Sequence, residues 1–178
     1  MNPRLKIIFF SLICILHITC FKTNAQVTTP VSATGHVIAE VIPVFAASET
    51  AQLNFGRFSP GPAGGSIILT PQNTISVLGS IYQGPGSHNA ASFYLSGDAD
   101  AAYSITLPSD PVVLTHTSSE KTMIIEEWNS TPPPGIGTGM LRDGFQVVSV
   151  GATLKVGSLR DNPAGIYTGV YTITFDFN

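Results

Sequence analysis

Apolar and polar residues alternate with a period of two along most of the chain. The pattern is clearest in Tyr103-Ser104-Ile105-Thr106-Leu107 and in Ala152-Thr153-Leu154-Lys155-Val156. Successive side chains of a β-strand point to opposite faces, so this alternation is typical of strands with one apolar and one solvated face. Antiparallel sheets that pack together on one side present strands of this kind. After residue 25 the sequence shows no sustained helical spacing of apolar residues.

We therefore predict about ten short strands, separated by turn signals such as Gly84-Pro85-Gly86 and Asn162-Pro163. Many short strands with regular turns are typical of an all-β fold, and we expect an immunoglobulin-like antiparallel β-sandwich. A β-barrel is the alternative. The predicted strands lie near residues 36–45, 50–57, 65–70, 74–82, 91–97, 101–108, 111–117, 121–128, 143–157 (one strand or two) and 166–177.

The first 25 residues have the three parts of a secretory signal peptide. A positively charged start is followed by an apolar core at residues 7–18, which is too short to span a bilayer, and by small residues that end at Ala25. We predict cleavage between Ala25 and Gln26, and export of the chain to the periplasm, the cell surface or the medium. A lipoprotein acylated at Cys20 is the alternative.

Cleavage at this position leaves a chain of the size of one ordinary domain. We expect residues 26–35 to form a short N-terminal extension and residues 36–178 to form a single β-sandwich domain. Both cysteines, Cys14 and Cys20, precede the cleavage position. The exported domain is therefore expected to depend on packing and sheet hydrogen bonds, without a disulfide.

The charge balance argues against nucleic acid and against an anionic membrane surface as partners. The whole chain has 8 basic and 11 acidic residues. Cleavage removes Arg4, Lys6 and Lys22 but no acidic residue, so the formal net charge falls from −3 to −6. Binding to phosphate groups requires clustered cations, and the sequence contains no such cluster.

The sequence offers little for catalysis or metal binding. His36, His88 and His116 lack metal-ligand spacing, and Asp98-Ala99-Asp100 has too few oxygen ligands for a calcium loop, so a turn is favoured. Glu126-Glu127 lies in a predicted strand, so its carboxylates are expected on opposite faces. The glycine-rich phosphate loops and the nucleophile elbow of hydrolases are absent from the sequence. We predict that the protein is not an enzyme and uses no cofactor.

Residues 129–139 (NSTPPPGIGTG) form the one long loop that we expect. Three consecutive prolines favour a stiff, extended segment: Pro132, Pro133 and Pro134. Together with Trp128 and Asn129, this loop is a candidate binding site for carbohydrate or protein. The alternatives are a long hairpin crossing for the loop and a place in the core for the tryptophan.

Three stretches of the chain resemble a known family when they are taken together. Leu53–Phe58 (LNFGRF) precedes a Pro- and Gly-rich turn, Ala91–Gly97 leads through an acidic turn into Tyr103–Pro108, and Val150–Gly157 is followed by Pro163–Gly169. This arrangement is similar to a family of exported bacterial proteins described as domain of unknown function 4402. The resemblance covers about residues 40–178 and implies export and an all-β fold, without an assigned activity.

That family in turn resembles the spore-coat-U proteins and the chaperone–usher pilin subunits. The resemblance implies a sandwich that lacks its last strand, and a neighbouring chain fills the gap with its N-terminal extension. Pilins usually end with alternating apolar residues, a penultimate aromatic residue and a glycine fourteenth from the end. Here Gly165 and Phe177 hold these two positions, and Tyr171, Ile173 and Phe175 alternate before Phe177.

Two features depart from the pilin pattern. Pilins often contain a disulfide, whereas the chain expected after cleavage has no cysteine. In addition, the segment 26–35 is short, weakly alternating and interrupted by Pro30. A complete, monomeric sandwich in which residues 171–177 form a core strand is therefore the competing hypothesis.

The sequence predicts an exported, non-enzymatic structural or adhesive protein. We expect a fimbria-like subunit or a cell-surface module that acts by pairing strand edges with other protein chains, either copies of itself or fimbrial subunits. The alternative is a secreted carbohydrate- or protein-binding module that uses the 129–139 loop.

Overall fold

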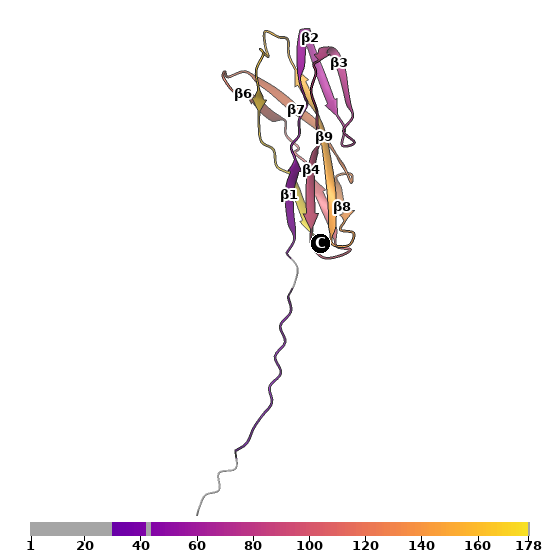
Figure 1. Ribbon diagram of the computed structural model, residues 1–178, viewed down its shortest axis with the longest axis vertical. Helices are drawn as coiled ribbons and strands as arrows, with labels where there is room; N and C mark the ends of the chain where they lie inside the picture. Colours follow the sequence, from indigo (N-terminus) through magenta and orange to yellow (C-terminus); the bar gives the residue numbers. More distant parts are fainter. Residues whose placement is uncertain (1–29, 42–43, 178) are drawn as a thin grey trace, which may run out of the picture. The chain divides into compact units, whose positions relative to one another are not determined.

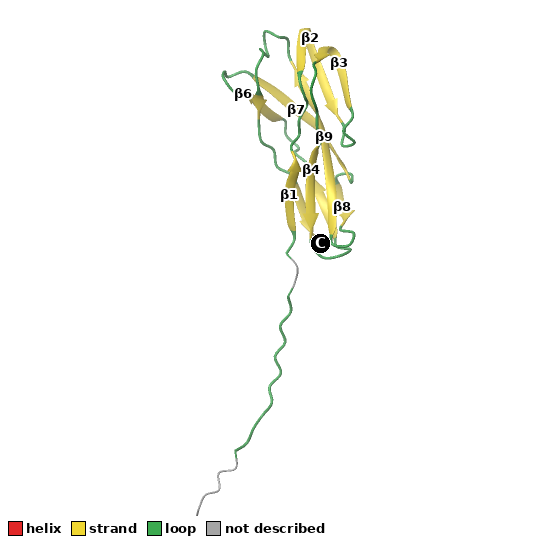
Figure 2. Ribbon diagram, in the orientation of Figure 1, coloured by secondary structure: helices red, strands yellow, loops and turns green. Residues whose placement is uncertain are grey.

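A computed structural model describes residues 30–41 and 44–177. Its strands form two antiparallel sheets, and no helix occurs among the described residues (Figures 1 and 2). The all-β prediction is confirmed. The strands are β1 (Ala46–Ala51), β2 (Phe58–Leu69), β3 (Ile75–Gln83), β4 (Ala91–Ser96), β5 (Ala102–Thr106), β6 (Val112–His116), β7 (Thr122–Thr131), β8 (Gly135–Met140), β9 (Phe145–Val156), β10 (Tyr167–Thr168) and β11 (Thr174–Phe177).

The larger sheet has the strand order β1-β4-β9-β7-β6-β10, and β2 joins it by pairing with both β9 and β3. The long strand β9 organises this sheet because its two halves have different partners. Its first half pairs with β4 through Ala91↔Val150, and its second half pairs with β2 through Leu69↔Ala152. The smaller sheet has the order β11-β5-β8.

Two clusters of buried side chains form the core. One lies between the sheets, where Leu95 and Val148 of the larger sheet pack with Tyr103 and Ile105 of the smaller sheet. The other lies within the curled half-barrel of the larger sheet and includes Ile67. The alternating apolar positions of residues 103–107 and 152–156 thus face inward, as their period of two predicts.

The start of the first strand differs from the prediction. The described residues between 36 and 45 form no strand, and β1 begins at Ala46. The predicted signal peptide, its cleavage position at Ala25 and Gln26, and both cysteines lie outside the described residues.

The predicted turn at Pro60-Gly61-Pro62 lies inside β2. Pro60 is tolerated there because this part of β2 pairs only with β3, through Pro60↔Ile81, whereas pairing with β9 starts at Gly65. A proline lacks the N–H donor of a ladder and is therefore confined to strand edges of this kind. A break in the register separates Pro60 from Gly65.

The predicted long loop at residues 129–139 is largely a pair of strands. β7 continues to Thr131 and β8 begins at Gly135, so only residues 132–134 connect them. β8 pairs with β5 and completes the smaller sheet. None of the described residues forms a helix with the length and apolar character needed to cross a bilayer.

Candidate strand-pairing site

The C-terminal strand predicted at residues 166–177 is divided between the two sheets. β10 pairs with β6 through Tyr167↔His116, and β11 pairs with β5 through Thr174↔Thr106 and Phe177↔Tyr103. The residues between them, 169–173, have no strand partner among the described residues. This part of the chain therefore passes from one sheet to the other.

Two strand edges meet at the end of this path. β1 is the last strand on one side of the larger sheet, and β11 is the last strand of the smaller sheet. The rings of Phe45 and Phe177 stack with centroids 4.1 Å apart, which places the start of β1 beside the end of β11. No ladder joins the two strands within the described residues. We call this junction the β1–β11 seam.

One face of the C-terminal strand is apolar. Its inward residues are half-buried against the core between the sheets, and the residues between them are exposed. Phe175 contacts the rings of Phe93 and Tyr103, at centroid distances of 5.9 and 6.3 Å. The inward residues are Tyr171, Ile173, Phe175 and Phe177. This stripe is the alternating pattern that the sequence predicted, and its half-burial leaves apolar area open at the seam.

Three aromatic rings cluster at the unpaired residues 169–173 of the C-terminal segment. The Tyr171 ring lies 4.7 Å from the Trp128 ring and 6.4 Å from the Phe93 ring. Tyr171 Oη and Trp128 Nε1 are buried and have no hydrogen-bond partner in the described part of the chain. Burial raises the pKa of the Tyr171 hydroxyl, and the negative charge of the Glu49 carboxylate raises it further.

Gly165 lies in the turn before the strand and makes room for a histidine. A Cβ atom at Gly165 would fall on the imidazole ring of His116. That ring is held by the Ser118 N–H, which donates to Nδ1 over 3.0 Å, and by Nε2 near the Ala164 carbonyl oxygen at 3.2 Å. Gly165 therefore allows β10 to lie close against β6. This is a structural role, in the turn before the C-terminal strand where the sequence singled out this glycine.

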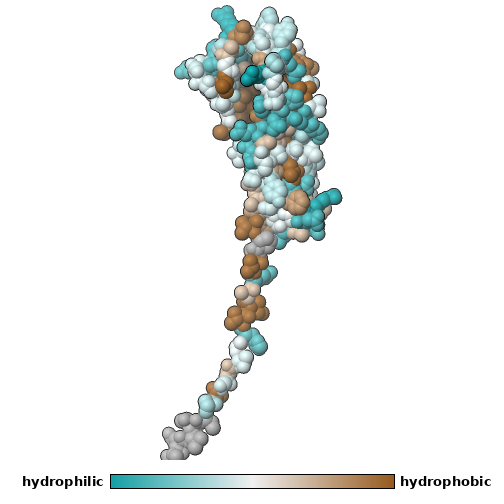
Figure 3. Space-filling model, viewed as in Figure 1, coloured by the Kyte–Doolittle hydropathy of each residue, from teal (hydrophilic) through white to brown (hydrophobic). Residues whose placement is uncertain are grey.

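The segment before β1 exposes several large apolar side chains. Val37, Ile38 and Val41 are 93–94% exposed, and Val44 is 83% exposed. Figure 3 shows hydrophobic residues along this segment. It contains no strand or helix among its described residues. The hydrophobic effect favours burial of such a segment in a partner.

The residues proposed for a binding loop lie in different environments. Trp128 packs against both core clusters, whereas Asn129 belongs to β7 and pairs with Gly151. Of the three prolines, Pro132 is half-buried, and Pro133 and Pro134 are exposed. The tryptophan therefore does not form a surface platform together with the loop.

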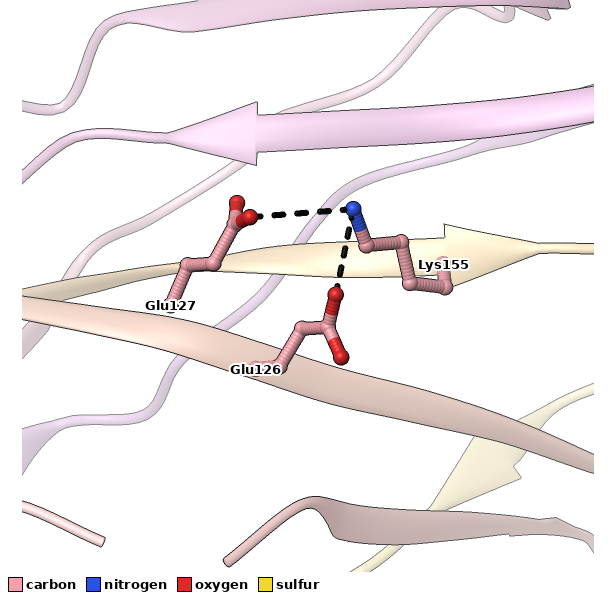
Figure 4. A network of polar contacts seen from close by, with 3 residues as sticks. All are labelled: Glu126, Glu127 and Lys155. Atoms are coloured by element: carbon pink, nitrogen blue, oxygen red, sulfur yellow. Dashed lines mark ion pairs between the residues drawn. The ribbon is translucent and has the colours of Figure 1, made fainter. Parts of the chain in front are cut away.

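The expectation for Glu126-Glu127 was wrong. Both carboxylates reach Lys155 Nζ, at 3.1 Å from Glu126 and 3.9 Å from Glu127 (Figure 4). The cause is a bulge in β7, where residues 127 and 128 oppose the single residue Ala152 of β9, and Glu127 has φ of 53°. The side chains are substantially exposed, so the ion pairs contribute at most about 1 kcal/mol.

The remaining polar candidates have local structural contacts. His88 Nε2 lies 3.1 Å from the Asn73 carbonyl oxygen, and Asp98-Ala99-Asp100 forms the turn between β4 and β5, as predicted. No group of three potential metal ligands converges among the described residues. Sequence reasoning missed Phe45 and Phe93 at the seam, because alternation identifies inward residues but not the sheet edge that they border.

Tyr103 lies beneath the seam, and its buried hydroxyl predicts that the folded domain loses stability at alkaline pH. Its side chain is fully buried, its Oη has no partner among the described residues, and burial raises its pKa to about 12. The unfolded chain loses this proton near pH 10, so stability is expected to fall by on the order of 2 kcal/mol as pH rises from about 10 to 12. Urea unfolding across this range measures the loss.

The variant Tyr103→Phe tests the same group at neutral pH. It removes a buried hydroxyl without a partner, so we expect it to raise the free energy of unfolding by about 1 kcal/mol and to reduce the alkaline loss. A loss of stability at pH 7 would contradict this prediction, because it would mean that the hydroxyl is hydrogen-bonded in the folded protein.

Comparison with known proteins supports the family that the sequence indicated. The chain has no significant match to a curated protein. The sequence model of the family described as Domain of unknown function (DUF4402) matches residues 45–177, which contain all the strands from β1 to β11. The more distant resemblance to spore-coat-U and pilin subunits stays a prediction. The chain belongs to the DUF4402 family.

Proposed function

We propose that the protein is an exported, non-enzymatic structural or adhesive subunit that accepts an extended strand of another protein chain at the β1–β11 seam. The observation that carries the proposal is the edge of β11, which has no partner strand among the described residues and whose apolar stripe is only half-buried beside the edge of β1. Both a fimbria-like subunit and a cell-surface module can act by strand pairing of this kind.

Strand addition uses two properties of the seam. Unpaired N–H and C=O groups of an edge strand form a template for another strand, and pockets between alternate side chains select its residues. On β11 the alternate inward side chains are Phe175 and Phe177. A slip by one residue turns the apolar side of an incoming strand toward solvent, so the stripe also sets the register.

The N-terminal segment of a neighbouring copy has the composition that the seam requires. In an extended conformation, Val37, Ala39 and Val41 share one face. These are small or medium apolar side chains, suited to the gaps between large aromatic residues, and the two valines are almost fully exposed in this chain. His36 and Glu40 fall on the opposite face, where they remain solvated.

The test compares the chain 26–178 with a variant that lacks residues 26–41. Light scattering after size exclusion and SDS gels without boiling are expected to show a ladder for the longer chain, which collapses on heating. The shorter variant is expected to be a folded monomer that binds a synthetic peptide of residues 36–41. Insertion accounts for these results because it buries the apolar face of the segment.

A pair of matched variants tests the face of the inserted segment. Val37→Asp combined with Val41→Asp places two charges at the seam and is expected to abolish the ladder, whereas Ile38→Asp on the opposite face retains it. A monomeric 26–178 chain with reversible two-state unfolding contradicts the proposal and supports the complete sandwich.

A further inference from the structure

Two loops that are far apart in the sequence form an open cleft of about 550 Å³. One loop joins β1 to β2 and contains the LNFGRF stretch up to Arg57, and the other joins β3 to β4 and begins with Gly84-Pro85-Gly86. Strand pairing at the seam uses neither loop. The residues that line the cleft are Asn54, Gly56, Arg57, Pro85, Gly86 and Ser87.

Backbone hydrogen bonds hold the two loops together. Asn54 and Asn89 exchange both main-chain hydrogen bonds, over 2.8 and 2.7 Å, and Gly84 N–H donates to the Arg57 carbonyl oxygen over 2.7 Å. The Asn54 side chain fixes the turn further, because its Oδ1 accepts from Gly56 N–H over 2.9 Å. The walls of the cleft are therefore preformed, which lowers the cost of ordering them around a ligand.

Glycine conformation shapes the cleft at the point where the loops approach. Gly56 has φ of 79°, in the region that favours glycine, and a Cβ atom there would lie 3.2 Å from the Ser87 carbonyl oxygen. A Cβ atom at Gly86 would lie 3.6 Å from Cγ and Cδ of Arg57. The arginine side chain thus extends past Gly86, and Arg57 is one of the residues that line the cleft.

Arg57 has no acidic partner in the described part of the chain, where the ion pairs all involve Lys155. Arg142 and Arg160 also lack an ion pair there, and Arg57 differs from them because it lines the cleft. A guanidinium offers a planar fork of donors that matches a carboxylate in a bidentate pair. The geometry is therefore that of a cation available to a ligand.

We infer that the cleft binds an acidic sugar, in which a carboxylate pairs with Arg57 and the hydroxyls contact Asn54 and Ser87. A single cation suits one carboxylate better than a phosphate, whose sites usually gather several cations or the N-terminus of a helix. The Pro85 ring supplies an apolar surface for one face of the sugar ring. The volume of the cleft lies in the range of small-ligand sites.

The probes are glucuronate and a galacturonate disaccharide, titrated into the chain 26–178 and followed by the backbone amide signals in NMR. We expect saturable shifts of the Gly56, Gly86 and Ser87 signals at millimolar ligand, and at least about tenfold weaker binding of glucose. Arg57→Ala is expected to weaken glucuronate binding by about tenfold or more, and Arg57→Lys to restore it only in part.

Arg142→Ala serves as the matched control, because Arg142 is also an exposed arginine but does not line the cleft. Its affinity for glucuronate is expected to be unchanged. The inference is overturned if the shifts do not saturate, if Arg57→Ala binds as the wild type does while keeping a folded spectrum, or if inorganic phosphate binds as tightly as glucuronate.

Discussion

Replacement of Gly151 by alanine is expected to destabilise the domain by about 3 kcal/mol or more. Gly151 lies in β9 where this strand leaves β4 and begins to pair with β2. A Cβ atom there would lie 2.1 Å from the Leu69 carbonyl oxygen and 2.8 Å from Pro71 N. Both atoms belong to the backbone, so one methyl group would displace the chain that leaves β2.

Chemical denaturation followed by circular dichroism measures this loss. The matched control is Gly137→Ala, which adds the same methyl group where no atom lies within 4 Å. Gly137 has φ of 64°, so the control is expected to cost about 1 kcal/mol from backbone strain alone. Equal losses in the two variants would show that close packing at Gly151 does not limit stability.

The second large effect is expected at Trp128, where the alanine variant should lose about 3 kcal/mol of stability. The side chain contacts both core clusters, so its removal leaves a cavity at the place where they meet. Its ring also packs against Tyr171 on the unpaired stretch of the C-terminal strand. The loss should therefore be accompanied by weaker strand exchange at the seam.

Trp128→Phe separates packing from polarity. It keeps most of the ring volume and removes the buried Nε1, which has no partner among the described residues, so we expect less than about 1.5 kcal/mol of destabilisation. Both variants remove the single tryptophan of the chain, so tryptophan fluorescence cannot report their unfolding. Far-UV circular dichroism follows unfolding instead. An alanine variant as stable as the wild type would contradict a core role for Trp128 and would favour a role in binding at the surface.

The period of two explains why the fold class and most strands follow from the sequence. β3, β4, β5 and β6 lie within a residue or two of their predicted limits, because each combines clear alternation with turn residues at both ends. In β9, alternation also identified the inward positions of its second half, Ala152, Leu154 and Val156. In its first half the register is the reverse of the expected one, because Val148 and Val150 are buried while Phe145 and Val147 are exposed. The same pattern on the C-terminal strand identified the stripe from Tyr171 to Phe177.

β8 shows where local patterns are insufficient. Its sequence, GIGTGM, has the glycines of a loop and no apolar alternation. It becomes a strand because β5 offers a partner, and Gly139 leaves room for the Tyr103 ring, with which a Cβ atom would overlap. The requirement for glycine at this position comes from a residue 36 positions earlier in the chain, so no window of sequence contains it.

The extra residue in β7 reverses a prediction in the same way. Regular alternation places Trp128 on the same face as Glu126, but the irregularity shifts the pattern by one residue. Trp128 and Ser130 then point inward, while Glu126 and Glu127 share Lys155. Pairing with β9 decides this shift, because the sequence of β7 alone fits either face.

The all-β class, the family and the apolar stripe of the C-terminal strand follow from the sequence alone, which also predicts an export signal. Alternation and turn chemistry are local properties, and they suffice for these features. Three features required the folded structure: residues 36–41 form no strand, β1 and β11 are edges that meet, and Arg57 lines a cleft between two loops. An edge is defined by the absence of a neighbour in space, and a cleft by the approach of distant loops, so neither has a signature within one segment.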